Sequence, residues 1–130
     1  MIFVVDDDPS VRKALKRLIV SVGYEVATFG SAEELLTSGR HELPDVFVID
    51  VRMPGVSGLE LQRALAASGS RTPVIFVTAY RDDQARTLAQ QAGAVAYLEK
   101  PVDEEVLLAA IRAGLKRQTF EALEAERPGQ

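Results

Sequence analysis

The chain has 130 residues, of which 47% are hydrophobic and 26% charged, a balance that suffices for one compact domain with a buried core. A formal net charge of −4 and a pI near 5.0 argue against a broad phosphate-binding surface, so we expect no direct binding of nucleic acid. The absence of cysteine excludes disulfides and thiolate metal sites and is compatible with a cytoplasmic protein. No stretch approaches the roughly 18 apolar residues of a membrane span, and we expect none.

Five short apolar runs rich in branched residues predict five strands. Four of them, residues 2–6, 45–50, 73–78 and 95–100, do not alternate between apolar and polar positions, which predicts strands buried on both faces. The run at 24–29 does alternate and is typical of an edge strand.

A helical pattern follows the first strand. Asp8 is a suitable N-cap, Pro9 suits the first turn, and Gly23 follows the end of the pattern. The apolar stripe of this helix consists of Val11, Leu15, Leu18, Ile19 and Val22.

Capping residues also precede four further helical patterns. They are Ser31 with Glu34, Ser57 with Glu60, Asp82 or Asp83, and Asp103. The fourth pattern ends at Gly93. The inward face predicted for the fifth helix consists of Val106, Leu107, Ala110, Ile111 and Leu115.

Strict alternation of strands and helices predicts an α/β protein with (βα)5 order: a doubly wound, five-stranded parallel sheet covered by helices on both faces. Two strand orders remain open. The common one for five strands is the flavodoxin-like order 2-1-3-4-5, whose binding site lies beyond the carboxyl ends of strands one and three.

Five polar side chains are expected at that edge of the sheet, because each follows or ends a predicted strand: Asp6, Asp7, Asp50, Thr78 and Lys100. Two carboxylates about 5 Å apart repel by roughly 3 kcal/mol at an effective dielectric constant near 20, so the acidic trio requires a cation. Oxygen ligands without histidine or cysteine favour Mg²⁺, with Mn²⁺ as an alternative, over zinc. The lysine and the threonine are suited to phosphoryl oxygens.

Four segments, VVDDDPSVR, VIDVRMPGVSG, FVTA and LEKP, resemble in order and spacing those of a response-regulator receiver domain. The resemblance covers residues 1–117 and is strongest to the receivers of FixJ/NarL-type transcription regulators. It implies a non-enzymatic protein of a two-component system that controls an output domain, in the transcription-factor branch a DNA-binding one.

By this resemblance, Asp50 is the phosphoacceptor and receives a phosphoryl group from a sensor histidine kinase. Asp7, Asp50 and the backbone carbonyl of Arg52 are then Mg²⁺ ligands, while Asp6 acts through water and Lys100 stabilises the phosphoryl group. Asp8 is expected to cap the first helix instead.

The resemblance also implies a switch. Thr78 bonds the phosphoryl oxygen, Tyr97 on the fifth strand turns inward, and the face formed by helix four, strand five and helix five changes, with phosphorylation-dependent homodimerisation as the expected readout. The bond between Lys100 and Pro101 is a candidate cis peptide. Arg52 and Tyr80 occupy positions that tune hydrolysis, and we hypothesise that they slow autodephosphorylation.

Residues 118–130 are expected to extend the last helix or to begin a linker. His41, the single histidine, is expected to be a solvated loop residue. Two other functions remain open: a haloacid-dehalogenase-type phosphatase, for which Asp6 and Asp8 imitate a DxD motif but Asp50 has no role, and a flavin- or nucleotide-binding module, for which a phosphate-binding loop is missing.

Overall fold

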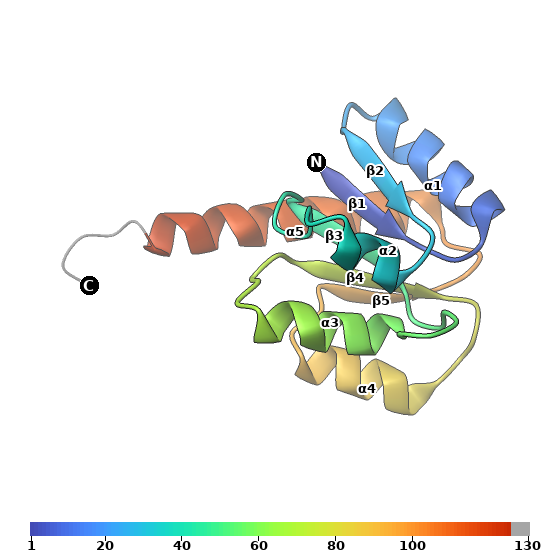
Figure 1. Cartoon of the computed structure of the whole chain (residues 1–130). Coiled ribbons are helices and arrows are strands. Elements are labelled where there is room, and N and C mark those ends of the chain that lie inside the picture. The colour runs from blue at the N-terminus through green and yellow to red at the C-terminus, as the bar shows by residue number, and fades with distance from the viewer. Residues whose placement is uncertain (126–130) are drawn as a thin grey trace.

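The computed structural model describes residues 1–125, in which five strands alternate with five helices (Figure 1). The elements are β1 (Ile2–Val5), α1 (Pro9–Ser21), β2 (Val26–Phe29), α2 (Ala32–Thr37), β3 (Val46–Asp50), α3 (Gly58–Ala67), β4 (Val74–Thr78), α4 (Asp83–Gln91), β5 (Ala96–Glu99) and α5 (Glu104–Ala125). All strand pairs are parallel and the order is β2-β1-β3-β4-β5. The predicted fold and strand order are therefore confirmed.

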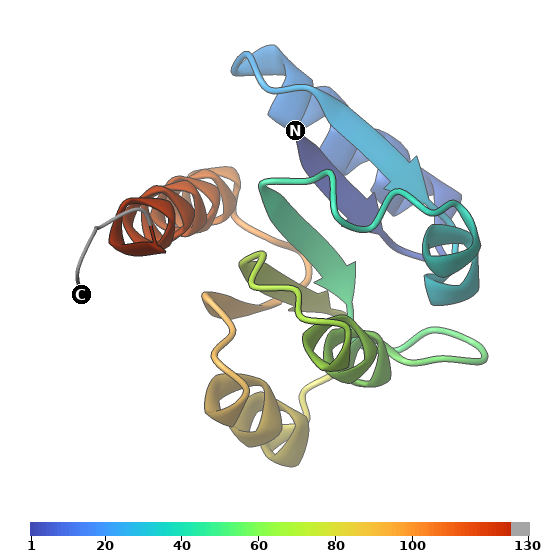
Figure 2. The same cartoon turned by 60° about the vertical axis from the view of Figure 1, so that its left-hand side comes forward.

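Two hydrophobic clusters form the core, one on each face of the sheet. On one face, α1 and α5 pack through residues that include Leu15, Ile19, Leu107 and Ile111. On the other, α2, α3 and α4 bury Leu35, Leu61, Leu65 and Ala89, among others. Figure 2 shows α5 and α3 on opposite sides of the sheet. The three central strands are buried on both faces because helices cover both.

Most predicted helix starts are confirmed by side-chain caps. Asp8 accepts hydrogen bonds from the N–H groups of Ser10 and Val11, and Ser57 with Glu60 forms a complete capping box. The cap of α4 is Asp82, and Asp103 accepts from the N–H of Val106. At α2 the box is only half formed, because Glu34 accepts from the N–H of Gly30 rather than from that of Ser31.

The prediction that residues 95–100 are buried on both faces is wrong. Strand β5 lies at the edge of the sheet, so that Tyr97 is buried while Glu99 is exposed. The alternating run at 24–29 is the opposite edge strand, β2, as predicted. Hydrophobic character alone did not separate the fifth strand from the central ones.

Two residues assigned to inward helix faces are also exposed. Val22 is 48% exposed because it lies at the C-cap of α1, where the chain turns away through Gly23. Val106 is 49% exposed, and Leu108 takes its place in the buried stripe of α5. The other members of both predicted faces are buried or partly buried.

Helix α5 continues past the body of the sheet, at the end opposite to the arrowheads of the strands (Figure 1). Arg117 Nη1 donates a 2.6 Å hydrogen bond to the carbonyl of Gly93, which ties the middle of α5 to the end of α4. The stretch from 118 to 125 is helical, and residues 126–130 lie outside the described residues. Within residues 1–125, no helix has the length and hydropathy to cross a membrane.

Candidate functional site

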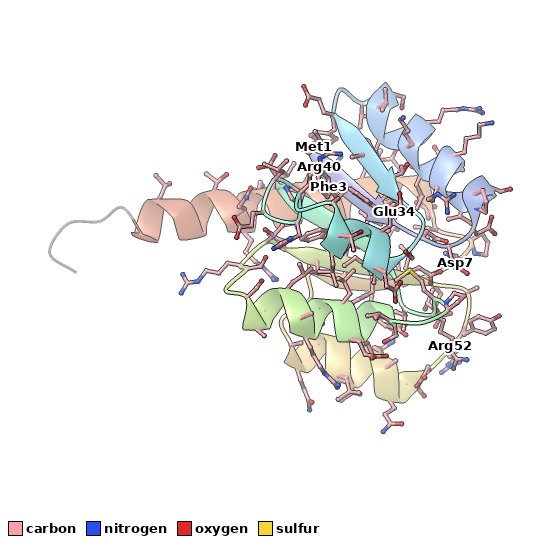
Figure 3. The ribbon with its side chains drawn as sticks, in the orientation of Figure 1. Met1, Phe3, Asp7, Glu34, Arg40 and Arg52 are labelled. Carbon is pink, nitrogen blue, oxygen red and sulfur yellow. The ribbon has the colours of Figure 1, made fainter. Side chains whose placement is uncertain are left out.

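Three carboxylates meet where β1 and β3 end side by side. Asp6, Asp7 and Asp50 each offer an oxygen, and these atoms all lie within 4.8 Å of one another. Asp6 and Asp50 are 0% and 5% exposed, whereas Asp7 faces solvent. The parallel pairing of β1 with β3 brings their carboxyl ends to one edge, so the predicted convergence of these residues is found. In Figure 3, Asp7 and Arg52 project at this same end of the molecule.

Asp6 is fixed by three contacts. Its Oδ1 accepts a 2.9 Å hydrogen bond from the N–H of Asp8, and its Oδ2 accepts one of 2.8 Å from Lys100 Nζ. Arg12 Nη1 donates to its backbone carbonyl at 2.7 Å. Both carboxylate oxygens of Asp6 are thus hydrogen-bonded within the protein, at shorter distances than the contacts of Asp50 Oδ1 with the N–H of Arg52 (3.3 Å) and of Asp50 Oδ2 with Lys100 (3.4 Å).

Lys100 is the cation of the site. Besides Asp6, its Nζ lies 3.4 Å from Asp50 Oδ2, and the lysine side chain is only 17% exposed. Burial lowers the pKa of Lys100, but the hydrogen bond to Asp6 and the charges of Asp50 and Asp6 outweigh burial and raise the pKa above its ordinary value. The ammonium group is therefore charged throughout the physiological range. The peptide bond that joins it to Pro101 is cis.

Asp50 is the carboxylate whose ionisation is most perturbed. Burial and the negative charge of Asp6 raise its pKa to about 6, against the opposing charge of Lys100. The N–H of Arg52 lies 3.3 Å from Asp50 Oδ1 and favours the ionised form. A further cation beside Asp50 would stabilise its ionised form.

Thr78 ends β4 next to this cluster and is 1% exposed. Its Oγ1 accepts a 3.2 Å hydrogen bond from the N–H of Tyr80 and lies 3.4 Å from the Tyr80 carbonyl. The hydroxyl is therefore engaged with the loop after β4 in this conformation.

Arg52 and Tyr80 lie against each other. The Arg52 guanidinium carbon lies 4.7 Å from the centre of the Tyr80 ring, and Arg52 Nη2 lies 3.5 Å from Asp82 Oδ2. Both side chains are more than half exposed. Together with Asp82 they line an open hollow of about 500 Å³, next to the carboxylate cluster, to which Val51 and Met53 also contribute.

Tyr97 lies apart from the carboxylates, buried on β5. Its ring centre is 6.3 Å from that of Phe76, and the Arg86 guanidinium lies 5.0 Å from it, with Arg86 also 3.3 Å from Glu99. Burial and the charge of Asp82 raise the pKa of its hydroxyl. Within the part of the chain that the structure describes, this buried hydroxyl has no hydrogen-bond partner.

His41 lies before β3 begins, whereas the carboxylate cluster lies at the carboxyl end of β3, so the strand separates them. The prediction of a solvated loop residue is only partly met, because His41 is half-buried. Its Nδ1 is buried and has no hydrogen-bond partner among residues 1–125.

The donor set fits a hard divalent cation. The three residues offer carboxylate oxygens alone, which suit Mg²⁺ or Mn²⁺ better than zinc. Of the three, Asp6 is the one that accepts the 2.8 Å hydrogen bond from Lys100. Burial and, after it, the negative charge of Asp6 raise the pKa of Asp50, and a cation bound beside Asp50 would offset both effects.

Sequence reasoning missed three residues that contact the loops of the site: Arg12, Glu33 and Asp82. Arg12 lies one helical turn after Asp8, so its contact with the Asp6 carbonyl was open to a careful reading of the helix start. Asp82 was assigned only a capping role. Glu33 binds the N–H of Val56, 23 residues away, and no local pattern signals that contact.

Comparison with known proteins agrees with this geometry. The sequence model of the response regulator receiver domain matches residues 2–112. Nodulation protein W of Bradyrhizobium diazoefficiens is 43% identical over 117 residues, which cover 90% of this chain and 52% of that protein. The transcriptional regulatory protein FixJ of Azorhizobium caulinodans is 41% identical over 116 residues, or 89% of this chain and 55% of that protein.

Solved structures give the same result. The response regulator StyR superposes with a TM-score of 0.88 at 43% identity, over 96% of this chain and 63% of that one. The FixJ-N structure gives a TM-score of 0.81 at 35% identity, over 88% of this chain and 92% of that one. The chain spans about half the length of the curated relatives described above. Fold, sequence match and the carboxylate cluster agree: this chain belongs to the response regulator receiver domain family of two-component systems.

Proposed function

We propose that Asp50 accepts a phosphoryl group from the phosphohistidine of a sensor histidine kinase and that the acyl phosphate changes the surface formed by α4, β5 and α5. The observation that supports this most directly is the position of Asp50. Its carboxylate is 5% exposed, lies 3.4 Å from the Lys100 ammonium, and shares the edge of the sheet with two further carboxylates.

The protonation state of Asp50 suits a nucleophile. With a pKa of about 6, its carboxylate is largely ionised at neutral pH. A carboxylate oxygen attacks phosphorus in line, the bond from phosphorus to the histidine nitrogen breaks, and its electron pair leaves with the imidazole. Lys100 stands beside the acceptor to offset the charge that grows on the phosphoryl oxygens.

Asp7, Asp50 and the backbone carbonyl of Arg52 are the proposed Mg²⁺ ligands, with Asp6 acting through water. Bound there, the ion would neutralise the carboxylates and phosphoryl oxygens. The hydrogen bonds that Asp6 accepts from Lys100 and Asp8 support its indirect role, because they use one lone pair on each of its oxygens and fix the orientation of the carboxylate.

Thr78 and Tyr97 are the proposed switch. The hydroxyl of Thr78 would exchange its contacts with Tyr80 for a phosphoryl oxygen, which would reposition the loop that leads to α4. The hydroxyl of Tyr97 is buried and has no hydrogen-bond partner among residues 1–125, so the inward position of the ring costs free energy. Because of that cost, the position of the ring can differ between two states of the domain.

The relatives include proteins named as transcriptional regulators, and they extend well beyond the matched region. We therefore propose a cytoplasmic regulator whose receiver controls an output domain, with a DNA-binding one as the leading candidate, and whose phosphorylated form pairs through α4 and β5.

Intact mass after incubation with acetyl phosphate and Mg²⁺ tests the chemistry. We expect a gain of one phosphoryl group that Asp50→Asn abolishes and EDTA prevents. A Glu42→Gln variant, altered at an exposed loop carboxylate, should be labelled like the wild type. Turnover of simple phosphoesters that depends on Asp6 and survives Asp50→Asn would instead support the phosphatase alternative.

Light scattering with and without beryllofluoride tests the switch. The wild type should shift towards a dimer when the analogue is added. Thr78→Ala should still gain a phosphoryl group in the mass assay but shift less, because the link to α4 is lost. An equal shift in both proteins would contradict the proposed role of Thr78.

A further inference from the structure

The carboxylate of Glu33 links α2 to the loop that follows the phosphoacceptor strand. Glu33 lies in the first turn of α2, and its Oε1 accepts a 2.8 Å hydrogen bond from the N–H of Val56. This bond lowers the pKa of Glu33 below its ordinary value, so the side chain is charged at neutral pH. The contact joins two segments that are 23 residues apart.

The loop is shaped to receive this carboxylate. Gly55 adopts a φ of +78°, a conformation that other residues rarely take. A Cβ atom at Gly55 would also lie 2.7 Å from Glu33 Oε1, closer than such atoms approach. The positive φ thus favours glycine at position 55, and the lack of a Cβ atom leaves room for Glu33 beside the backbone.

The same loop carries Arg52, whose carbonyl is the proposed third protein ligand of the metal. At its ends the loop is closed by a 2.8 Å hydrogen bond from the N–H of Gly58 to the carbonyl of Val51. Gly58 is packed so tightly that a Cβ there would lie 2.2 Å from the Asp50 carbonyl oxygen. Between these closures, Glu33 holds the backbone from the side of α2.

We propose that Glu33 is a positioning residue that orders the loop of residues 51–57 and thereby sets the Mg²⁺ affinity of the site. The inference rests on the proposed function. A loop that is ordered before binding need not be ordered by the ion, so more of the binding free energy appears as affinity. Groups that hydrogen-bond a metal ligand directly change metal affinity by about 10- to 100-fold, so we expect an effect at the lower end of that range for Glu33, which acts through the loop.

The experiment is a Mg²⁺ titration of the isotope-labelled chain, followed by amide NMR, with hydrogen exchange of the Val56 N–H as a second readout. Glu33→Ala should weaken Mg²⁺ binding about tenfold and speed exchange at Val56. Glu33→Gln, whose amide oxygen still accepts a hydrogen bond, should recover most of both effects.

Glu34→Ala is the matched control. It removes the same charge from the adjacent position of the same helix, but its carboxylate bonds the N–H of Gly30 and not the loop. It should leave the exchange of Val56 unchanged and alter Mg²⁺ affinity by less than about twofold. Equal weakening by both alanine variants would overturn the proposal in favour of a general charge effect.

Gly55→Ala changes the loop side of the contact and should weaken Mg²⁺ binding as Glu33→Ala does, since the added methyl group would displace the carboxylate and strain the loop at a φ of +78°. Wild-type affinity in both variants overturns the role of Glu33 and leaves the proposed function intact. A wild-type chain that binds no Mg²⁺ would refute the metal site itself, and the positioning role with it.

Discussion

Lys100 and Asp6 are 94 residues apart in sequence, yet their Nζ and Oδ2 atoms lie 2.8 Å apart at the carboxyl edge of the sheet. The carboxylate is fully buried, and the ammonium also reaches Asp50. One cation thus faces two of the three acids, and its removal should change the ionisation of Asp50.

Replacing Lys100 by methionine should raise the pKa of Asp50 above about 6, because the charge of Lys100 opposes the effects of burial and of Asp6. Carbon NMR of the labelled Asp50 carboxyl group, titrated without Mg²⁺, measures the shift. Lys16→Met, on the exposed side of α1, is the control. An Asp50 pKa that stays at the wild-type value would show that Lys100 is screened from the acceptor.

Asp50→Asn should stabilise the metal-free protein at neutral pH. The pKa of Asp50 is about 6 in the folded chain and near the ordinary 3.8 in the unfolded chain, so the folded state binds more protons between these values. Stability contributed by this group is therefore fully present below about pH 4 and is lost as the pH rises through 6. With allowance for solvent screening, the loss at pH 7 is about 1 to 3 kcal/mol.

Urea unfolding of both proteins from pH 4 to pH 8 checks this sign. The difference in unfolding free energy should be small at pH 4 and grow up to about pH 7, and Mg²⁺ should reduce it. Asp83→Asn, at a carboxylate whose side chain is 80% exposed, should show no such growth. A constant offset across the whole range would contradict the assignment to Asp50.

Tyr97→Phe should stabilise the metal-free domain by about 1 kcal/mol, since it removes a buried hydroxyl that lacks a partner among the described residues. Thermal unfolding measures the gain. Tyr80→Phe, at a ring that is 56% exposed, should change the stability by less than about 0.5 kcal/mol. Destabilisation of the Tyr97 variant would mean that its hydroxyl is hydrogen-bonded, for example to water.

Arg52→Ala should speed the loss of the phosphoryl group about two- to fivefold, or roughly 0.4 to 1 kcal/mol in the barrier, because the Arg52–Tyr80 pair would partly shield a phosphoryl group on Asp50 from attack by water. The decay of the phosphorylated mass with time gives the rate. Arg81→Ala removes an arginine whose side chain is 79% exposed and should decay like the wild type. If neither Arg52→Ala nor Tyr80→Ala alters the rate, the shielding hypothesis is wrong.

The parts of the fold that follow from local chemistry were predictable. A cap such as Asp8 or Ser57 acts within three residues of itself, and the end of a parallel strand fixes the edge at which Asp50 lies. The acidic trio was therefore placed correctly from strand ends alone.

Features that depend on packing between distant segments were not predictable. The run of residues 95–98 does not alternate between apolar and polar residues, so the sequence did not mark β5 as an edge strand, and its place at the edge leaves Glu99 exposed. The contact of Glu33 with Val56 requires the folded arrangement of α2 against the β3–α3 loop, which no spacing along the chain records. Such tertiary contacts control the details of the site more than its composition does.

Helix α5 is 22 residues long and therefore spans roughly 33 Å, from the end that carries Lys100 to well beyond the opposite end of the sheet (Figure 1). The hydrogen bond from Arg117 to the carbonyl of Gly93 holds the helix near its middle and is a point about which it can tilt. A tilt of about 5° about that contact would move Ala125, roughly 12 Å further along the helix, by about 1 Å. Up to Ala125, α5 would thus transmit a change of angle as a rigid rod.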